Sequence, residues 1–485
     1  MTSVPPPSQA IVIFGASGDL TKRKIIPALY NLCSEGLLPE KVAIVGYART
    51  EWSEEEFREH AREGVEKFSR TPLEDDTWKV FSELLHYISG EFHEEHCFSH
   101  LKEELDHLDA QLGLEGRRLF YCATPPSAFP LIIRRIGELG DIGDARIVIE
   151  KPFGHDLASA KELNGIVHEV FNESRVFRID HYLGKETVQN ILMFRFANSM
   201  FERIWNSDAL DHVQITVAED LGVEGRGAYY EEAGAIGDIL QNHVLQVLAF
   251  LAMEPPRSLE PEAIRDEKVK LLRAVHPFKT DDVVRGQYVT CEVDGKTVPG
   301  YHDEEGVAKD STTETYAAVR THIDNWRWSG IPIYLRTGKR LPRRTTQVVV
   351  FFREAPGYLF EASGMATGVA DHIAIQIQPD EGISLAFNAK EPGPDLNIKP
   401  VHMTFSYAES FKAEPAEAYE RLIMEAMEGD HTLFLRQDGV ERAWELLEPV
   451  LDVPGEVHVY PRGGWGPPEA DALIAPRKWH TSADD

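Results

Sequence analysis

One short segment of the chain carries an unusual density of ionisable side chains. It reads Arg178-Ile-Asp180-His181-Tyr182-Leu-Gly184-Lys185-Glu186. We predict that Gly184 ends a strand and that Lys185 begins a helix, which brings His181, Tyr182 and Lys185 together near a helix N-terminus. Two potential cations, a hydroxyl donor and the helix dipole would form a good pocket for a phosphate group. A single histidine is more often structural, but packing alone does not explain this density.

A glycine turn near the N-terminus predicts a dinucleotide-binding site. Gly15-Ala-Ser17-Gly18-Asp19-Leu20 stands between an apolar run at 11–14 and a stretch of helical apolar spacing at 21–32. Gly15 would let the chain turn tightly, and Gly18 would let the backbone approach a pyrophosphate that rests on the helix N-terminus. Because the spacing is GxxG and not the full GxGxxG, an ordinary strand-to-helix turn remains the alternative.

Arg49 indicates which dinucleotide would bind. Proteins that bind NAD commonly have an acidic residue at the end of the second strand, which accepts a hydrogen bond from the ribose. Here that segment is Gly46-Tyr-Ala-Arg49-Thr. Arg49 stands where a 2′-phosphate would lie, and Ser17 could donate a hydrogen bond to it. Exposed arginines are common on any surface, but this position favours NADP, with NAD as a weaker alternative.

Lys151 follows another buried strand, in Glu150-Lys151-Pro152-Phe153-Gly154. Pro152 restricts Lys151 to an extended backbone. This would hold the ammonium group at the carboxyl end of the sheet, where ligands bind in open α/β folds. There it could contact a substrate oxygen or the nicotinamide ribose. For this tripeptide alone, a solvated lysine at a loop entry is the alternative.

These residues require a parallel sheet to position them. Short apolar runs at 11–14, 41–47, 118–123 and 145–149 predict buried strands, and helical patterns such as 53–68 stand between them. Strands that alternate with helices indicate βαβ units and a parallel sheet. We therefore predict an α/β Rossmann-type coenzyme domain over residues 10–180, preceded by a flexible tail at 1–9.

The pattern changes beyond about residue 180. Helices are expected at 185–196 and 237–253, together with strand-like stretches at 211–218, 283–292, 347–352, 372–378 and 383–388. Many of these are joined by short turns, such as 379–382, and short connections favour antiparallel pairing. We predict that residues 181–485 form an α+β domain, built on a large, mainly antiparallel sheet, for substrate binding and oligomerisation.

Composition excludes several classes of partner. The formal net charge is −30 over 485 residues, which argues against nucleic acid and anionic membranes. No long uncharged apolar run and no signal-peptide pattern occurs, so we expect a cytoplasmic protein. The four cysteines, Cys33, Cys97, Cys122 and Cys291, show neither a CxxC pair nor a nearby histidine at zinc spacing. We therefore expect neither a disulfide framework nor a bound metal.

The motifs GASGDL, EKPFG and RIDHYLGKE occur in an order that resembles the glucose-6-phosphate dehydrogenase family. The similarity runs from about residue 10 to the C-terminus and includes LRTGK at 335–339 and AYERL at 418–422. RIDHYLGKE is highly specific to this family, whereas the first two motifs are shared more widely. The resemblance implies oxidation of D-glucose 6-phosphate to 6-phospho-D-glucono-1,5-lactone with reduction of NADP, the first step of the oxidative pentose phosphate pathway. It also implies a homodimer or homotetramer.

The resemblance assigns roles to individual residues. His243 would be the base that takes the C1 hydroxyl proton, and Asp180 would orient its imidazole and stabilise the cation. Thr124 and Pro125 would contact the nicotinamide half of the coenzyme. Gln376 stands where some animal relatives carry an arginine for a second NADP, so no second site is expected. The implied substrate contacts are Lys151, His181, Tyr182, Lys185, Glu219, Asp238, Lys339, Arg344 and Gln378.

Two other classes of protein stay open. A dehydrogenase of an unphosphorylated sugar, of the glucose–fructose oxidoreductase type, would combine a dinucleotide fold, an EKP turn and an open sheet, but would lack the group His181, Tyr182 and Lys185. A non-catalytic NADP-binding regulator would be favoured by loss of Asp180, His243 or Lys185, and all three are present. The basic run contains Lys339, Arg340, Arg343 and Arg344. It is interpreted as a patch that faces a phosphate group. The alternative is that at least half of these residues belong to a solvated, charged loop.

Overall fold

A computed structural model describes residues 5–481 except 141, 294, 357, 359–368, 412–415 and 454. The chain forms two compact units: the first comprises Met1–Lys185, Pro256–Asp266 and Pro415–Glu441, and the second comprises Glu186–Pro255, Glu267–Glu414 and Arg442–Asp485. The first unit therefore extends to Lys185 and not to residue 180, and two later segments join it. Residues 1–4 of the expected tail lie outside the described residues, and the first strand begins at Gln9.

The first unit is built on a seven-stranded sheet with the order β17-β6-β5-β4-β1-β2-β3. Its strands are β1 (Gln9–Phe14), β2 (Val42–Ala48), β3 (Leu85–Ser89), β4 (Arg118–Cys122), β5 (Arg146–Ile149), β6 (Val176–Ile179) and β17 (Phe434–Leu435). The first six strands pair in parallel, and β17 adds an antiparallel neighbour to β6. Every residue of β1 and β2 is buried, which explains their continuous apolar sequences. The predicted Rossmann-type sheet is confirmed.

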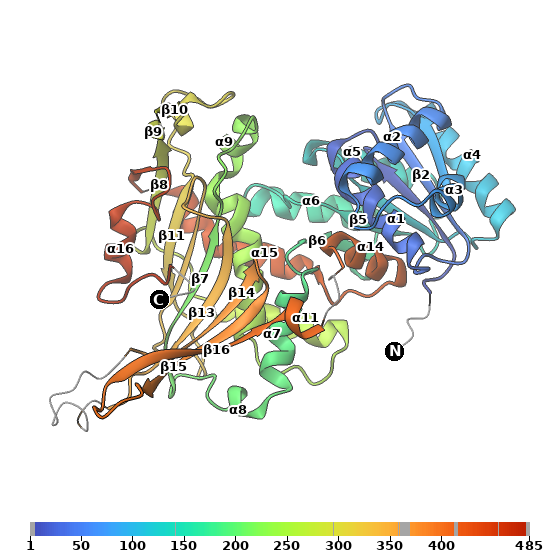
Figure 1. The fold of residues 1–485 in the computed structure, drawn as a ribbon. Coiled ribbons are helices and arrows are strands. Elements are labelled where there is room, and N and C mark those ends of the chain that lie inside the picture. The colour runs from blue at the N-terminus through green and yellow to red at the C-terminus, as the bar shows by residue number, and fades with distance from the viewer. Residues whose placement is uncertain are drawn as a thin grey trace. The chain divides into compact units, whose positions relative to one another are not determined.

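Helices surround this sheet (Figure 1). They are η1 (Thr21–Ile25), α1 (Ile26–Ser34), α2 (Glu54–Phe68), α3 (Asp75–Glu83), α4 (Glu95–Leu112), η2 (Pro126–Ala128), α5 (Phe129–Glu138), α6 (Leu157–Val170), η3 (Glu173–Arg175) and α14 (Ala418–Glu428). Local side chains define where some of them begin. At α2, Ser53 Oγ accepts a hydrogen bond from the Glu56 backbone N–H at 3.2 Å, and the Glu56 carboxylate accepts one from the Ser53 N–H at 2.8 Å. This reciprocal capping box satisfies two otherwise unpaired N–H groups.

A segment from far along the chain completes the first unit. Helix α14 packs against α1, and its Glu420 side chain is only 1% exposed. Arg70 Nε donates to Glu420 Oε1 at 2.9 Å and Arg70 Nη2 donates to Glu420 Oε2 at 2.8 Å, while Asn31 Nδ2 donates to Oε1 at 2.8 Å. A buried carboxylate with a bidentate arginine and an amide donor is well satisfied. Glu420 therefore ties residues 415–441 to the N-terminal part of the chain.

The second unit contains a nine-stranded sheet with the order β16-β15-β14-β13-β7-β12-β11-β8-β18. The strands are β7 (Leu210–Ala218), β8 (Val283–Val289), β11 (Tyr316–Thr321), β12 (Ile333–Gly338), β13 (Thr345–Phe352), β14 (His372–Gln378), β15 (Gly382–Lys390), β16 (Ile398–Ser406) and β18 (Val457–Pro461). Only the pairs β7–β12 and β8–β18 are parallel among the neighbours in this sheet as described. The prediction of a large, mainly antiparallel sheet is confirmed. The strand expected at 283–292 ends earlier, because β9 (Cys291–Val293) pairs instead with β10 (Lys296–Val298).

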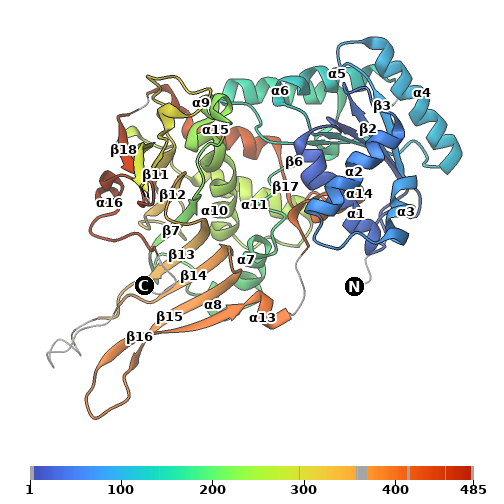
Figure 2. The ribbon, with the colours of Figure 1, turned by 45° about the horizontal axis from the view of Figure 1, so that its top comes forward.

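Helices cover part of this sheet: α7 packs against β14, and η4 packs against β7 and β12. Figure 2 shows α7 and α10 on one side of the sheet. The helices of this unit include α7 (Glu186–Phe196), α8 (Ser199–Glu202), α9 (Gly227–Ala235), η4 (Ile236–Val244), α10 (Leu245–Ala252), η5 (Thr280–Asp282), η6 (Tyr301–Asp303), α13 (Tyr407–Phe411) and α16 (Pro468–Ile474). Helices α11 (Pro261–Ala274) and α15 (Gln437–Asp452) begin in the first unit and end in the second.

The helical run Gly227–Ala252 is long and apolar enough to span a membrane, with a mean hydropathy of 1.3. However, 94% of its apolar window is buried inside the protein. Such burial is typical of a core helix, whose apolar side chains are removed from water by packing against other elements. The run therefore belongs to the core of the second unit.

Candidate active site

The turn after β1 has the backbone geometry that the sequence predicts for a dinucleotide site. Gly15 has a φ of 88°, and a Cβ on it would lie 2.5 Å from the carbonyl oxygen of Ala123. Both the left-handed backbone and the close approach exclude a side chain here. The Gly18 N–H donates to the Gly15 carbonyl oxygen at 2.9 Å, which closes the turn at the start of the following helix. The helix N-terminus is therefore free of side-chain bulk from these two residues.

Ser17, in the glycine turn, is hydrogen-bonded to the residue that follows Arg49 in the chain. The Thr50 hydroxyl donates to Ser17 Oγ at 2.9 Å, and Arg49, directly after β2, is exposed. The carboxylate of Asp19 pairs with Arg23 at 2.7 Å. The group that Asp19 can offer to a pyrophosphate is therefore its backbone N–H. Arg49 is therefore the chain neighbour of the residue that binds the Ser17 hydroxyl.

The segment after β4 contains a buried hydroxyl group that could bind a ligand. The Thr124 hydroxyl is buried and, among the described residues, has no hydrogen-bond partner. Buried hydroxyl groups are normally paired, so such an atom needs an explanation, and a ligand atom is one. Pro125 follows it and precedes η2. The turn at Gly15, which is free of side-chain atoms, and the Thr124 hydroxyl both fit a dinucleotide that lies across the carboxyl ends of β1 and β4.

Glu150 is a buried carboxyl group that the sequence did not single out. The Tyr121 hydroxyl donates to Glu150 Oε1 at 2.7 Å, and Tyr419 also donates to this carboxyl. Burial raises the pKa of Glu150 to about 7, although both tyrosines and the neighbouring Lys151 oppose the rise. Both Glu150 and Tyr419 lie inside motifs that the family resemblance uses, which is the signal that could have identified them. The backbone of Lys151 is thereby anchored next to a buried polar cluster.

The turn at residues 180–185 brings the expected phosphate-binding group together. Asp180 Oδ1 accepts from the Tyr182 N–H at 2.9 Å, and the Lys185 N–H donates to the Tyr182 carbonyl oxygen at 3.1 Å. The ring of His181 lies 5.1 Å from the ring of Tyr182, and Lys185 Nζ lies 5.4 Å from the same ring. The imidazole and the ammonium group therefore each lie next to the phenol ring of Tyr182.

Gly184 has a different role from the predicted one. The strand already ends at Ile179, and α7 begins at Glu186 and not at Lys185. A Cβ on Gly184 would lie 2.8 Å from the Ala418 carbonyl oxygen and 2.9 Å from the Ala418 Cβ. Glycine is needed because α14 packs directly on this turn. Two motifs far apart in the sequence, RIDHYLGKE and AYERL, are thus in contact.

In the second unit, Lys339 joins two carboxylates. Its ammonium group is paired with Glu219 and lies 3.7 Å from Asp238 Oδ2, and the Lys339 and Asp238 side chains are only 4% and 7% exposed. The Tyr229 hydroxyl donates to Asp238 Oδ1 at 3.3 Å. Buried charges are stabilised when they are paired and hydrogen-bonded. A cation between two acceptors is also a good arrangement for binding the hydroxyl groups of a sugar.

Strand register explains why these residues meet. Ala218 is the common partner of Gly338 on β12 and Thr345 on β13. The residues that follow β7 and β12, Glu219 and Lys339, therefore lie at the same edge of the sheet as Arg344, which precedes β13.

Gln378 reaches the same edge through β14. It pairs with Thr346 of β13, and Arg344 Nη2 donates to its side-chain oxygen at 3.4 Å. The structure thus gathers four of the expected substrate residues along one edge of the sheet.

The basic run from Lys339 to Arg344 divides into two kinds of residue. Arg340 lies 3.6 Å from the Glu304 carboxylate, and Arg343 donates to the Thr481 carbonyl oxygen. Arg340 and Arg343 thus bind groups outside the expected site, whereas Lys339 and Arg344 contact other expected site residues. The solvated-loop interpretation therefore does not describe Arg340, because its side chain and that of Glu304 are each only 11% exposed.

Asp238 and His243 both belong to η4, a π-helical segment. Such segments are rare and occur frequently at functional sites. His243 is only 1% exposed, and its backbone N–H donates to Asn242 Oδ1 at 2.5 Å. Asp180 belongs to the first unit and is equally buried. The expected roles of His243 and Asp180 stay predictions.

These features define a two-unit protein of the dinucleotide-dependent oxidoreductase class, with a parallel-sheet unit for the coenzyme and an open-sheet unit that presents paired charges at one edge. Family models for the glucose-6-phosphate dehydrogenase NAD binding domain and C-terminal domain match residues 12–190 and 192–480. The chain therefore belongs to the glucose-6-phosphate dehydrogenase family.

Individual relatives match along almost the whole chain. The chain is 45% identical over 481 residues to glucose-6-phosphate 1-dehydrogenase 2 of Mycobacterium tuberculosis, covering 97% of this chain and 94% of the relative. It is also 45% identical over 484 residues to glucose-6-phosphate 1-dehydrogenase of Chlamydia pneumoniae, covering 96% and 94%.

Solved structures of glucose-6-phosphate dehydrogenases are also similar to this chain over nearly its whole length. A glucose-6-phosphate dehydrogenase in complex with its substrate glucose-6-phosphate has a TM-score of 0.90 and 38% identity, with 99% of this chain and 100% of that chain covered. The Mycobacterium avium glucose-6-phosphate 1-dehydrogenase has a TM-score of 0.87 and 37% identity, with 98% and 99% covered. A levoglucosan dehydrogenase, at a TM-score of 0.50 and 11% identity, shares the fold alone.

Proposed function

We propose that the protein oxidises D-glucose 6-phosphate to 6-phospho-D-glucono-1,5-lactone, with NADP as the hydride acceptor, in the first step of the oxidative pentose phosphate pathway. Family membership supports the reaction. The observation that carries the substrate assignment is the turn at 180–185, because His181, Tyr182 and Lys185 gather there. An enzyme for an unphosphorylated sugar has no use for such a group of phosphate donors.

The coenzyme would occupy the carboxyl edge of the parallel sheet. Gly15 and Gly18, with the N–H groups of Asp19 and Leu20, would hold the pyrophosphate at the helix N-terminus. Ser17 and Arg49 would bind the 2′-phosphate, while Thr124, Pro125 and Lys151 would contact the nicotinamide side. When bound, NADP accepts the hydride that leaves the sugar C1.

The chain's own residues would orient the sugar and move the proton. His243 would accept the proton of the C1 hydroxyl on its imidazole, and the Asp180 carboxylate would stabilise the resulting cation. Glu219 and Asp238 would accept hydrogen bonds from sugar hydroxyls, and Lys339 would donate one. Such positioning converts a bimolecular encounter into an oriented one. Arg344 and Gln378 would complete the substrate edge.

The test is a measurement of reduced-nicotinamide absorbance with purified protein in four mixtures: glucose 6-phosphate or glucose, each with NADP or NAD. We expect rapid reduction with glucose 6-phosphate only, and faster reduction with NADP. Activity with glucose alone would instead support a dehydrogenase of unphosphorylated sugars. No activity in any mixture would support a non-catalytic NADP-binding regulator.

We also propose that the protein is a cytoplasmic homodimer or homotetramer. Each of the four cysteines, Cys33, Cys97, Cys122 and Cys291, is a free thiol, as is usual in a reducing compartment. Light scattering on the eluting peak of a size-exclusion column would measure the mass. A mass of 54.7 kDa, that of one chain, would contradict the proposed assembly.

A further inference from the structure

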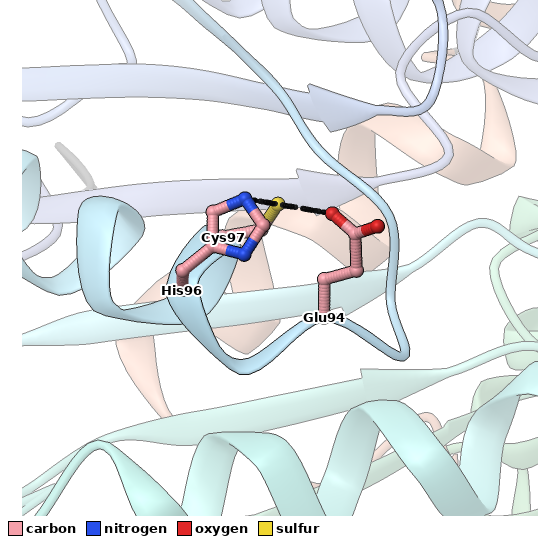
Figure 3. A group of neighbouring side chains, drawn as sticks. All are labelled: Glu94, His96 and Cys97. Atoms are coloured by element: carbon pink, nitrogen blue, oxygen red, sulfur yellow. Dashed lines mark hydrogen bonds and ion pairs between the residues drawn. The ribbon is translucent and has the colours of Figure 1, made fainter.

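Three side chains with metal-binding atoms converge where β3 leads into α4. Glu94 is the residue that precedes α4, and His96 and Cys97 lie in its first turn. Cys97 Sγ lies 3.5 Å from Glu94 Oε2 and 3.5 Å from His96 Nε2. His96 Nε2 in turn lies 3.5 Å from Glu94 Oε2. Figure 3 shows the three side chains directed toward one another, so the three donor atoms form a nearly equilateral triangle.

This triangle has the dimensions of a tetrahedral zinc site. Zinc binds thiolate sulfur at about 2.3 Å, imidazole nitrogen at about 2.0–2.1 Å and carboxylate oxygen at about 2.0–2.2 Å. With tetrahedral angles, these bond lengths place the donor atoms about 3.3–3.6 Å apart. All three observed separations fall in that interval. The three separations are therefore compatible with one ion bound to all three atoms at ordinary bond lengths.

The kinds of donor select the metal. A thiolate and an imidazole favour zinc and similar transition metals, whereas calcium and magnesium prefer sites made of oxygen atoms. Three protein ligands leave a fourth position that a water molecule can fill. The Cys97 residue is 8% exposed, while the Glu94 and His96 side chains are 42% and 80% exposed. An ion can therefore enter from solvent and reach a sulfur atom that is largely shielded.

The surrounding contacts show what such an ion would stabilise. The Gly90 N–H donates to the Ala48 carbonyl oxygen at 2.9 Å, and the Tyr47 hydroxyl donates to the Glu91 carbonyl oxygen at 3.3 Å. A Cβ on Gly90 would lie 2.5 Å from Tyr47 Oη and 2.9 Å from Cys97 Cβ. The segment from Gly90 to Cys97 is thus packed closely against the end of β2.

We propose that Glu94, His96 and Cys97 form a binding site for one zinc ion, which fixes the connection between β3 and α4. We expect no bound metal from the sequence alone, and the proposed site departs from that expectation. The residues are too close in the chain to match the usual zinc spacings, and they converge because they occupy the start and the first turn of one helix. The proposal is independent of the substrate and of the enzyme's activity.

The test uses cobalt as a spectroscopic probe of the full-length, reduced and metal-free protein. We expect one equivalent of Co²⁺ to produce a thiolate-to-cobalt charge-transfer band, together with the intense visible bands of low coordination number, and Zn²⁺ to displace it. Cys97→Ser should abolish the charge-transfer band. His96→Asn and Glu94→Gln should weaken Co²⁺ binding by at least about 10-fold, because even loss of a supporting residue outside the ligand shell typically costs about 10–100-fold.

Two matched controls keep the interpretation specific. His93→Asn removes an exposed histidine from the same turn, and Cys291→Ser removes a thiol from the other unit; both should keep the band and the affinity. Since His96 is 80% exposed, His96→Asn should fold normally. Zn²⁺ should raise the thermal midpoint of the wild-type protein but not that of His96→Asn.

Three results would overturn the proposal. The first is no charge-transfer band in the wild-type protein, and the second is an undiminished band in Cys97→Ser. The third is an unchanged affinity in both His96→Asn and Glu94→Gln, which would mean that the thiol binds cobalt alone and that hydrogen bonds hold the triangle together.

Discussion

Replacing Glu150 by glutamine should stabilise the protein at neutral and alkaline pH but not at acidic pH. The carboxyl group is buried, and burial raises its pKa from 4.5 to about 7. In that interval the folded protein keeps a proton that the unfolded chain releases, so the free energy of unfolding falls as the pH rises. Each pKa unit of difference corresponds to about 1.4 kcal/mol. The full interval therefore corresponds to about 3 kcal/mol, which Glu150→Gln, being always neutral, does not lose.

The assay is urea unfolding of the full-length wild-type and Glu150→Gln proteins between about pH 4 and pH 8, followed by circular dichroism. Other titrating groups are shared, so they cancel in the difference between the two proteins. We expect a difference near zero at the acidic end and a gain of about 3 kcal/mol for the variant at the alkaline end. Tyr121→Phe, which removes a hydrogen bond to the ionised carboxyl, should lower stability further at alkaline pH. A difference that does not change with pH would refute the reasoning, because it would mean that Glu150 titrates alike in both states.

Four further predictions follow from the described contacts. His243→Asn should lower turnover by about 10²–10⁴-fold with little change in KM for the sugar phosphate; unchanged turnover in steady-state kinetics would exclude His243 as the base. Lys185→Ala should raise the KM for glucose 6-phosphate much more than it affects plain glucose, and equal losses would show that it does not bind the phosphate. Arg49→Ala should reduce kcat/KM for NADP far more than for NAD, whereas a parallel fall would contradict the coenzyme assignment. Glu420→Ala should destabilise the protein by about 1–3 kcal/mol in urea unfolding, because the buried Asn31 amide and the Arg70 guanidinium lose an acceptor, while Arg70 keeps its ion pair with Glu35. The exposed Glu417, changed to alanine, should cost about 1 kcal/mol or less, and equal costs for the two variants would contradict the role given to burial.

Apolar runs made several strands predictable from the sequence, whereas one strand with a fully buried charge was not predicted. β1, β2 and β5 were expected because each contains a continuous apolar run, as is typical of a strand buried on both faces of a parallel sheet. β12 was missed because it contains Arg336, which is fully buried. Its guanidinium carbon lies 4.7 Å from the ring of Trp465 and 4.4 Å from the ring of Trp479. No local pattern reveals that such a charge is sheltered by aromatic rings from the end of the chain.

The candidate site shows a similar division. Ligand-binding roles could be predicted for Gly15, Lys151 and the 180–185 turn from local sequence, because each follows the end of a strand. The meeting of Glu219 with Lys339 depends on the register of β7 and β12, which the sequence does not encode locally. Glu150 was overlooked because its partners, Tyr121 and Tyr419, come from distant segments.

The return of residues 415–441 to the first unit has a consequence for how the protein is made. A ribosome that adds about 5–20 residues per second releases Lys185 roughly 10–50 s before Pro415 follows. During that time β6 is an open sheet edge, because β17 has not been synthesised, and the surface of α1 that α14 covers is exposed. Open edges and uncovered apolar surfaces are where nascent chains aggregate. The sheet of the coenzyme unit therefore lacks β17, and α1 lacks its α14 cover, during most of the unit's synthesis. The unit can be completed only after Glu441 has been translated.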